Sequence, residues 1–150
     1  MKKLSKQLKW RILIGTVVVL GLLSVIFPIE RTNPPVTGEI EAPEEVMAIL
    51  HRSCFDCHSN ETKWPWYSYV APVSWLVAKD VRDGRGHINF SEWADYNSKQ
   101  KEHKQEECGE MVAIGEMPLW FYVPLHLDSE MIPKDIEIIL AWSKGTLHKE

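Results

Sequence analysis

The chain carries the stretch SCFDCHSN at residues 53–60, in which two cysteines lie three positions apart and a histidine directly follows the second. In a helix this spacing places both thiols on one turn, with the imidazole on the next residue. The chain of 150 residues has one other cysteine, Cys108. Cys54 and Cys57 are therefore the one pair of thiols that lie close together in the sequence.

The pattern C-x-x-C-H is the attachment signature of c-type haem. In such a site, each thiol adds to one vinyl group of the porphyrin and forms a thioether bond. The histidine then binds the iron from the same side of the ring. The motif predicts that Cys54 and Cys57 hold one covalent haem and that His58 is the proximal ligand of its iron.

Three other interpretations of the motif compete with haem. A structural zinc site needs four ligands in a tetrahedron, and the chain has no second C-x-x-C pair. A thioredoxin-like redox pair belongs in a βαβ setting, which the sequence does not indicate. A simple disulfide between Cys54 and Cys57, with His58 as a bystander, remains an alternative.

The N-terminal segment has the features of a membrane anchor. Five basic residues and no acidic residue occupy positions 1–11, and no charged residue occurs between positions 12 and 27. At a rise of about 1.5 Å per residue, a helix from Trp10 to Ile29 would span about 30 Å, the thickness of a bilayer's hydrocarbon core. By the positive-inside rule, the basic end stays in the cytoplasm.

These features predict a cytoplasmic basic head at 1–11, a transmembrane anchor at 12–29, a Pro-rich linker at 30–42 and a haem-binding domain at 43–150. A cleaved signal peptide is the alternative, but the apolar run is long and lacks a small-residue cleavage site. Either interpretation exports the domain. We expect a single-pass protein of the cell membrane, with its C-terminal domain on the extracytoplasmic, periplasmic side.

Charge limits the possible partners of the exported part. Residues 12–150 contain 12 Lys and Arg against 21 Asp and Glu, a net charge of −9. Phosphate backbones attract the opposite sign, so nucleic acid is not an expected partner. The expected partners are the membrane and an unidentified redox protein, and no small-molecule substrate is predicted.

Helical signals recur through the exported domain, and no convincing strand pattern interrupts them. We predict an all-α fold, a small cytochrome c-like helical domain preceded by one transmembrane helix. Long loops are uncommon in a compact domain unless something fills the space between them, and a flat apolar cofactor would do so. The predicted helices are 43–58, 72–86 (ended by Gly84 and Gly86), 90–96, 99–114 (capped by Ser98 and stopped at Gly115) and 133–145 (ended by Gly145), with long loops at 59–69 and 117–131.

Haem iron has a second axial position, and a methionine on a loop is a frequent ligand there. Met117 follows a predicted helix end and precedes Pro118, which would stiffen the loop. Met117 is therefore the predicted sixth ligand, with His126 as the second candidate. Packing in the core is the alternative role for Met117. Four aromatic residues could line the pocket and contact the propionates: Trp64, Trp66, Tyr67 and Trp75.

Several motifs occur together in a recognisable order: DCHSN at 56–60, WPWY at 64–67, APVSW at 71–75, NFSEW at 89–93 and GEMP at 115–118. Over roughly residues 44–144, the chain closely resembles the bacterial haem-binding domain family, small single-haem members of the cytochrome c class. The resemblance implies covalent haem on Cys54 and Cys57 with His58 on the iron, and a downstream methionine that falls on Met117. Cys108 departs from the pattern but lies outside the matched motifs.

Two functions follow if the chain holds haem. Iron ligated by both His58 and Met117 would transfer single electrons outside the cytoplasmic membrane, without enzymatic activity. A labile or absent Met117 would instead leave a haem-based sensor or a protein that binds a small ligand or peroxide. A membrane-anchored interaction module without haem is the third class.

Overall fold

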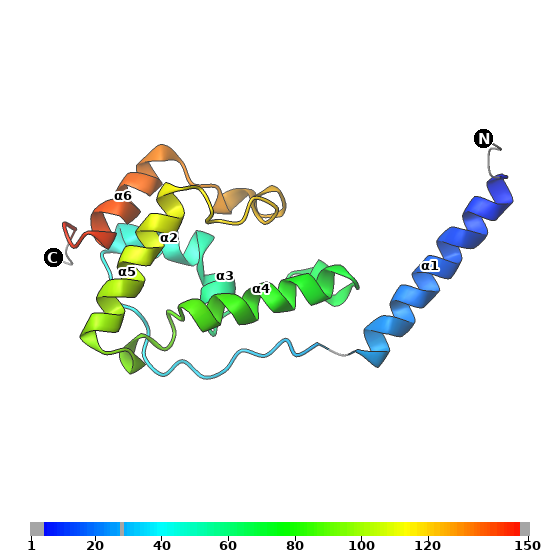
Figure 1. Cartoon of the computed structure of the whole chain (residues 1–150), viewed down its shortest axis with the longest axis horizontal. Coiled ribbons are helices and arrows are strands. Elements are labelled where there is room, and N and C mark those ends of the chain that lie inside the picture. The colour runs from blue at the N-terminus through cyan, green and yellow to red at the C-terminus, as the bar shows by residue number, and fades with distance from the viewer. Residues whose placement is uncertain (1–4, 28, 148–150) are drawn as a thin grey trace. The chain divides into compact units, whose positions relative to one another are not determined.

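The computed structural model describes residues 5–27 and 29–147. It is helical, as predicted, with six α-helices and no β-strand within the described residues; the β-type pairing recorded is an isolated parallel bridge between Gly38 and Glu92. Figure 1 shows the helices α1 (Lys6–Ile26), α2 (Glu44–Ser53), α3 (Phe55–His58), α4 (Val73–His87), α5 (Ser98–Ala113) and α6 (Pro133–Ser143).

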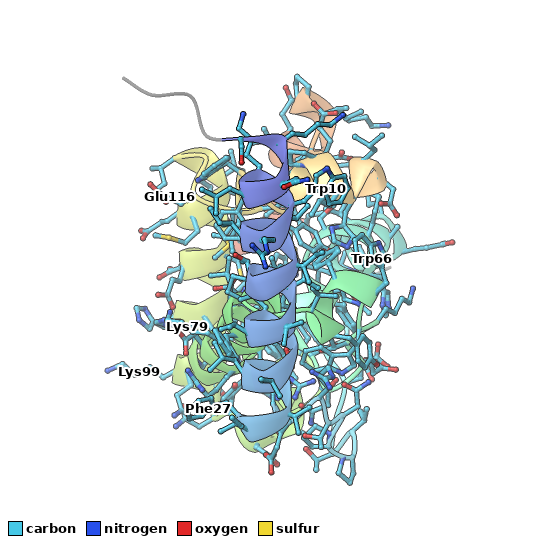
Figure 2. The ribbon with its side chains drawn as sticks, turned by 90° about the vertical axis from the view of Figure 1, so that its right-hand side faces the viewer. Trp10, Phe27, Trp66, Lys79, Lys99 and Glu116 are labelled. Atoms are coloured by element: carbon cyan, nitrogen blue, oxygen red, sulfur yellow. The ribbon has the colours of Figure 1, made fainter. Side chains whose placement is uncertain are left out.

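Helix α1 has 21 residues and is long and apolar enough to cross a membrane by length and composition, with a mean hydropathy of 1.9. It begins at Lys6 inside the basic head, where the Ser5 hydroxyl accepts a hydrogen bond from the Leu8 amide at 3.3 Å. It ends at Ile26, three residues before the predicted end of the span. Trp10 and Phe27 lie toward opposite ends of this helix (Figure 2). Residues 1–4 of the predicted head lie outside the described residues.

The chain divides into two compact units, one formed by Met1–Thr32 with Trp64–Asp80 and the other by Asn33–Lys63 with Val81–Glu150. The second unit contains most of the hydrophobic core. Side chains of α2 and α6 form this core together with residues 88 and 90 and with residue 112 of α5. The predicted boundaries at 30–42 and 43–150 stay predictions. The buried core residues are Ile40, Ala42, Val46, Ile49, Leu50, Phe55, Ile88, Phe90, Val112, Ile139 and Trp142.

Helices α5 and α6 lie side by side in the second unit (Figure 1). Gly109 on α5 permits this close approach, because a Cβ atom there would overlap the Ser143 hydroxyl of α6. The N-terminus of α6 is held by Asp135, whose carboxylate accepts from the Ile132 amide at 3.0 Å and from Arg52 at 2.7 Å. The salt bridge from Arg52 thus links α2 to α6.

Several predicted helix ends are confirmed and others are wrong. Gly115 and Gly145 follow α5 and α6 with φ of 74° and 66°, the left-handed conformation that glycine adopts readily. The N-cap of α5 is Asn97 rather than Ser98, and its side chain accepts from the Gln100 amide at 3.0 Å. The predicted helix at 90–96 is only a 3₁₀ turn, η2 (Trp93–Asp95).

The predicted loops also contain short 3₁₀ turns: η1 (Trp66–Tyr69), η3 (Val123–Leu125) and η4 (Leu127–Ser129). Helix α4 does not end at Gly84 and Gly86 as predicted but continues through both to His87. Neither Gly84 nor Gly86 has a positive φ, so neither acts as a helix terminator.

Candidate functional site

The motif C-x-x-C-H lies at a break between two helices, not within one continuous helix as predicted. Cys54 separates α2 from α3 with φ −128° and ψ −37°. In a continuous helix, Phe55 would be rotated by at least 120° from both Ile49 and Leu50 around the axis. The break instead lets Phe55 join the same core, where it stacks on Phe90 at 5.4 Å between ring centroids.

The imidazole of His58 is oriented by two backbone carbonyls. Its Nδ1 lies 3.0 Å from the Gly84 oxygen and 3.3 Å from the Ile88 oxygen. A carbonyl only accepts, so Nδ1 carries the proton and Nε2 carries the lone pair. Burial lowers the pKa of His58 below its usual value, which keeps the ring neutral at neutral pH, although both carbonyls oppose this shift. Together these features leave Nε2 as a metal ligand of fixed tautomer.

Helix α4 packs directly against the motif through Gly84. A Cβ atom on this residue would lie 2.6 Å from the Cys57 oxygen and 3.1 Å from the Cys57 carbonyl carbon. Only glycine permits this contact without a shift of backbone. The same close approach brings the Gly84 carbonyl to His58, so one residue supports both the position of Cys57 and the tautomer of His58.

The next residue of α4, Arg85, holds the chain that leaves the motif. The Arg85 guanidinium donates to the Ser59 carbonyl at 2.7 Å through Nε. Its Nη2 donates to the Thr62 hydroxyl at 2.9 Å and to the Asn33 side chain at 3.0 Å. Arg85 thereby links α4 to Asn33 and to the segment 59–62, all within the second unit.

A buried polar network connects the motif to residues 89–92. The Asn89 side-chain amide nitrogen donates to the Asn60 side-chain oxygen at 2.9 Å. The Asn60 backbone amide donates to the Ser91 hydroxyl at 3.0 Å. The Phe90 backbone amide donates to the His58 carbonyl at 2.8 Å. Asn60, Asn89 and Ser91 are buried, so each of these bonds also satisfies a polar group that water cannot reach.

Asp56 ties the motif to the long loop that follows α5. Its carboxylate accepts from the Tyr122 hydroxyl at 2.8 Å and from the Lys63 amide at 3.0 Å. Both bonds have a charged acceptor, the stronger class of hydrogen bond. The loop that carries Met117 and His126 is therefore fastened to Asp56, one of the two residues between the cysteines.

The three cysteines, all within the described residues, form no disulfide. Burial raises the pKa of the Cys54 thiol, with smaller contributions from the nearby Cys108 and Cys57 thiols, while Arg52 opposes the shift. Burial, together with Glu107, raises the pKa of Cys108 to about 12. A thioredoxin-like redox pair requires a lowered thiol pKa, so the environment of Cys54 does not suit that chemistry.

The structure places the two candidate sixth ligands in different surroundings. Met117 is partly buried and packs against the hydrophobic core, which Cys54 also contacts. His126 stacks on the Tyr122 ring at 3.8 Å between centroids, and its Nδ1 lies 3.1 Å from the Tyr122 carbonyl. His126 also lines a polar cavity of about 390 Å³ beside Asp56. Ligation by either residue stays a prediction.

The aromatic residues predicted to line the pocket all belong to the other unit, within Trp64–Asp80. The indole nitrogen of Trp64 is buried and has no hydrogen-bond partner among the described residues, whereas 77% of Trp66 is exposed. Their predicted contact with propionates stays a prediction.

Gly84, Arg85 and Tyr122 support the site but were not identified as site residues from the sequence. Gly84 was interpreted as a helix terminator, since its contact with Cys57 depends on a residue 27 positions away. Asp56, Asn60, Asn89 and Ser91 did give a signal, because they lie inside the motifs that carry the family resemblance.

The donor set suits haem better than a bare metal ion. It offers two adjacent thiols and a neutral imidazole of fixed tautomer, as haem attachment requires. No group of three or more His, Cys, Asp or Glu side chains arranged to hold a metal ion is found among the described residues. A zinc site built from four protein ligands is therefore not supported among residues 5–27 and 29–147.

Comparison with known protein families gives a match to this chain. Residues 18–145 match the model of a protein family described as a haem-binding domain. No curated protein and no solved structure matches significantly. The match covers most of the chain and includes Cys54, Cys57 and His58. The chain therefore belongs to the haem-binding domain family, and its cofactor is haem.

Proposed function

We propose that this protein is a membrane-anchored c-type cytochrome, which holds one haem covalently and transfers single electrons. The observation that carries the proposal is the orientation of His58, whose Nδ1 lies within hydrogen-bonding distance of two carbonyls and which directly follows Cys57 in the chain. When bound, the haem supplies one-electron redox chemistry. Electron transfer needs no further catalytic residue, so we propose a carrier and not an enzyme.

Each residue of the site has a distinct role in this proposal. Cys54 and Cys57 attach the ring covalently, and His58 binds the iron through Nε2. Gly84 lets α4 approach the motif and keeps the proton of His58 on Nδ1. An Nδ1–H bond to a carbonyl fixes the orientation of the ring and raises its basicity as a ligand.

The proposed topology rests on α1 and on the distribution of charge. Five basic residues precede the apolar run, which predicts that this end faces the cytoplasm. The haem-binding domain then lies on the extracytoplasmic side, where its partner is a redox protein of the membrane or periplasm. A net charge of −9 over residues 12–150 favours a partner with a basic docking surface.

The full chain, purified from membranes of a host with intact haem maturation, tests the proposal. We expect the denatured polypeptide to exceed its sequence mass by one haem. We also expect a redox titration followed by absorption to fit one one-electron step. A polypeptide with the mass of its amino acids alone would contradict covalent attachment.

A second function is favoured by one observation, the packing of Met117 against the hydrophobic core. If this side chain stays in the core, the iron keeps an open axial position. The protein would then bind a small ligand such as carbon monoxide or peroxide and act as a sensor or a ligand-binding protein.

Met117→Ala and His126→Ala separate the two functions. If Met117 is the sixth ligand, we expect its removal to convert low-spin haem to high-spin haem that binds carbon monoxide readily. The sulfur-to-iron charge-transfer absorption band would be lost at the same time. His126→Ala serves as the matched control and should leave both the spin state and the charge-transfer band unchanged.

Two results would contradict Met117 as the ligand. One is a wild-type spectrum in Met117→Ala. The other is a conversion to high spin in His126→Ala alone, which would assign the axial position to the histidine. High-spin haem in the unmodified protein would favour the ligand-binding function instead.

A further inference from the structure

The unit that contains the anchor also presents an exposed aromatic turn, which we define as Trp66, Tyr69 and Val70. Their exposed fractions are 77%, 58% and 51%. Trp66 and Tyr69 belong to η1, and Val70 follows it directly. Such large apolar side chains gathered in a short segment usually mark an interaction surface.

Arg31 ties this aromatic turn to the end of the anchor. Its Nη1 donates to the Ser68 carbonyl at 3.0 Å, inside the turn. Its guanidinium carbon lies 4.3 Å from the centroid of the Tyr69 ring, within the range of a cation–π contact. Residues 31 and 69 therefore stay together whatever the orientation of the rest of the chain.

The length of chain between the anchor and Arg31 is short. Helix α1 ends at Ile26, and the five residues from there to Arg31 reach at most about 18 Å. A bilayer of about 40–45 Å with a hydrocarbon core of about 30 Å has a polar layer of about 5–8 Å on each side. Arg31, and with it the aromatic turn, can therefore lie no more than about 10–13 Å beyond the polar layer of the leaflet where the anchor emerges.

The composition of the turn suits this location. Tryptophan and tyrosine concentrate at membrane–water interfaces, where their rings lie among the headgroups. Arginine keeps its charged group near the phosphates while its stem covers apolar surface. We infer that the aromatic turn inserts into the interface of the same bilayer that holds α1, as a second membrane contact. This inference rests on the proposed anchor.

Spin labels on the full-length, haem-loaded chain in lipid vesicles test the inference. A nitroxide on Trp66→Cys is compared with one on Trp120→Cys, both in a Cys108→Ala background that leaves no other unattached thiol. Trp120 is a matched control because 82% of it is exposed and it belongs to the other unit. Collisions with oxygen report lipid, and collisions with a water-soluble nickel chelate report water.

We expect oxygen to reach the label at position 66 and the nickel chelate to collide with it several-fold less often than at position 120. Equal nickel accessibility at both positions would overturn the inference. Protection of position 66 from both reagents would also overturn it, because the side chain would then be covered by protein or haem. Failure of the proposed anchor is distinguishable, since that chain would not float with the vesicles.

Discussion

Replacing both Cys54 and Cys57 by alanine is expected to abolish covalent haem attachment completely. Thioether bonds survive denaturation, whereas a bond from His58 to iron does not. The denatured double variant should therefore have the mass of its polypeptide alone and give no haem stain on a denaturing gel. Either single variant keeps one thiol and should attach less haem than the unmodified protein.

Cys108→Ala is the matched control for this experiment. Cys108 is partly buried and packs against the same core as Cys54, but it lies outside the motif. Its replacement should leave the haem content per chain unchanged. Haem that stays on the denatured double variant, or that is lost in Cys108→Ala, would contradict attachment through Cys54 and Cys57.

Gly84→Ala should cause the second large effect, a loss of stability with a disturbed haem environment. The new methyl group would lie 2.6 Å from the Cys57 oxygen, so α4 or the motif must move. Overpacking of this kind costs about 1–3 kcal/mol. The movement would also weaken the bond from His58 Nδ1 to the Gly84 carbonyl and change the absorption spectrum of the haem.

Gly86→Ala provides a closely matched control two residues along the same helix. A Cβ atom there meets nothing within 4 Å, and φ is not positive. Alanine in place of glycine within a helix gains about 0.5–1 kcal/mol, so this variant should be slightly more stable than the parent. Thermal unfolding of both variants, followed by haem absorption, gives the comparison. Equal midpoints would show that the contact at Gly84 has no special role.

The sequence was most informative where the signal is local. The three-residue spacing of Cys54 and Cys57, followed by His58, predicted a covalent haem, and the family match supports a haem cofactor. An uncharged run between positions 12 and 27 predicted the apolar helix α1. Gly115 and Gly145 predicted helix ends, because the left-handed conformation there is a property of the residue itself.

Predictions failed where a distant residue decides the local structure. Gly84 looked like a helix terminator, yet α4 continues and uses the glycine to approach Cys57. The helix over residues 43–58 is broken at Cys54, because the break brings Phe55 into the core beside Phe90. Neither outcome follows from propensity, since both depend on what lies across the core.

The sequence alone predicted haem, which the family match supports, and the residues expected to hold it, because thiol spacing and hydropathy are set by neighbours in the chain. Tertiary structure decided the state of those residues. The Gly84 and Ile88 carbonyls, 26 and 30 positions from His58, select its tautomer. Tyr122, 66 positions from Asp56, fastens the distant loop to the motif. Contacts of this kind arise only when the packing of the whole core brings distant backbone and side chains within hydrogen-bonding distance.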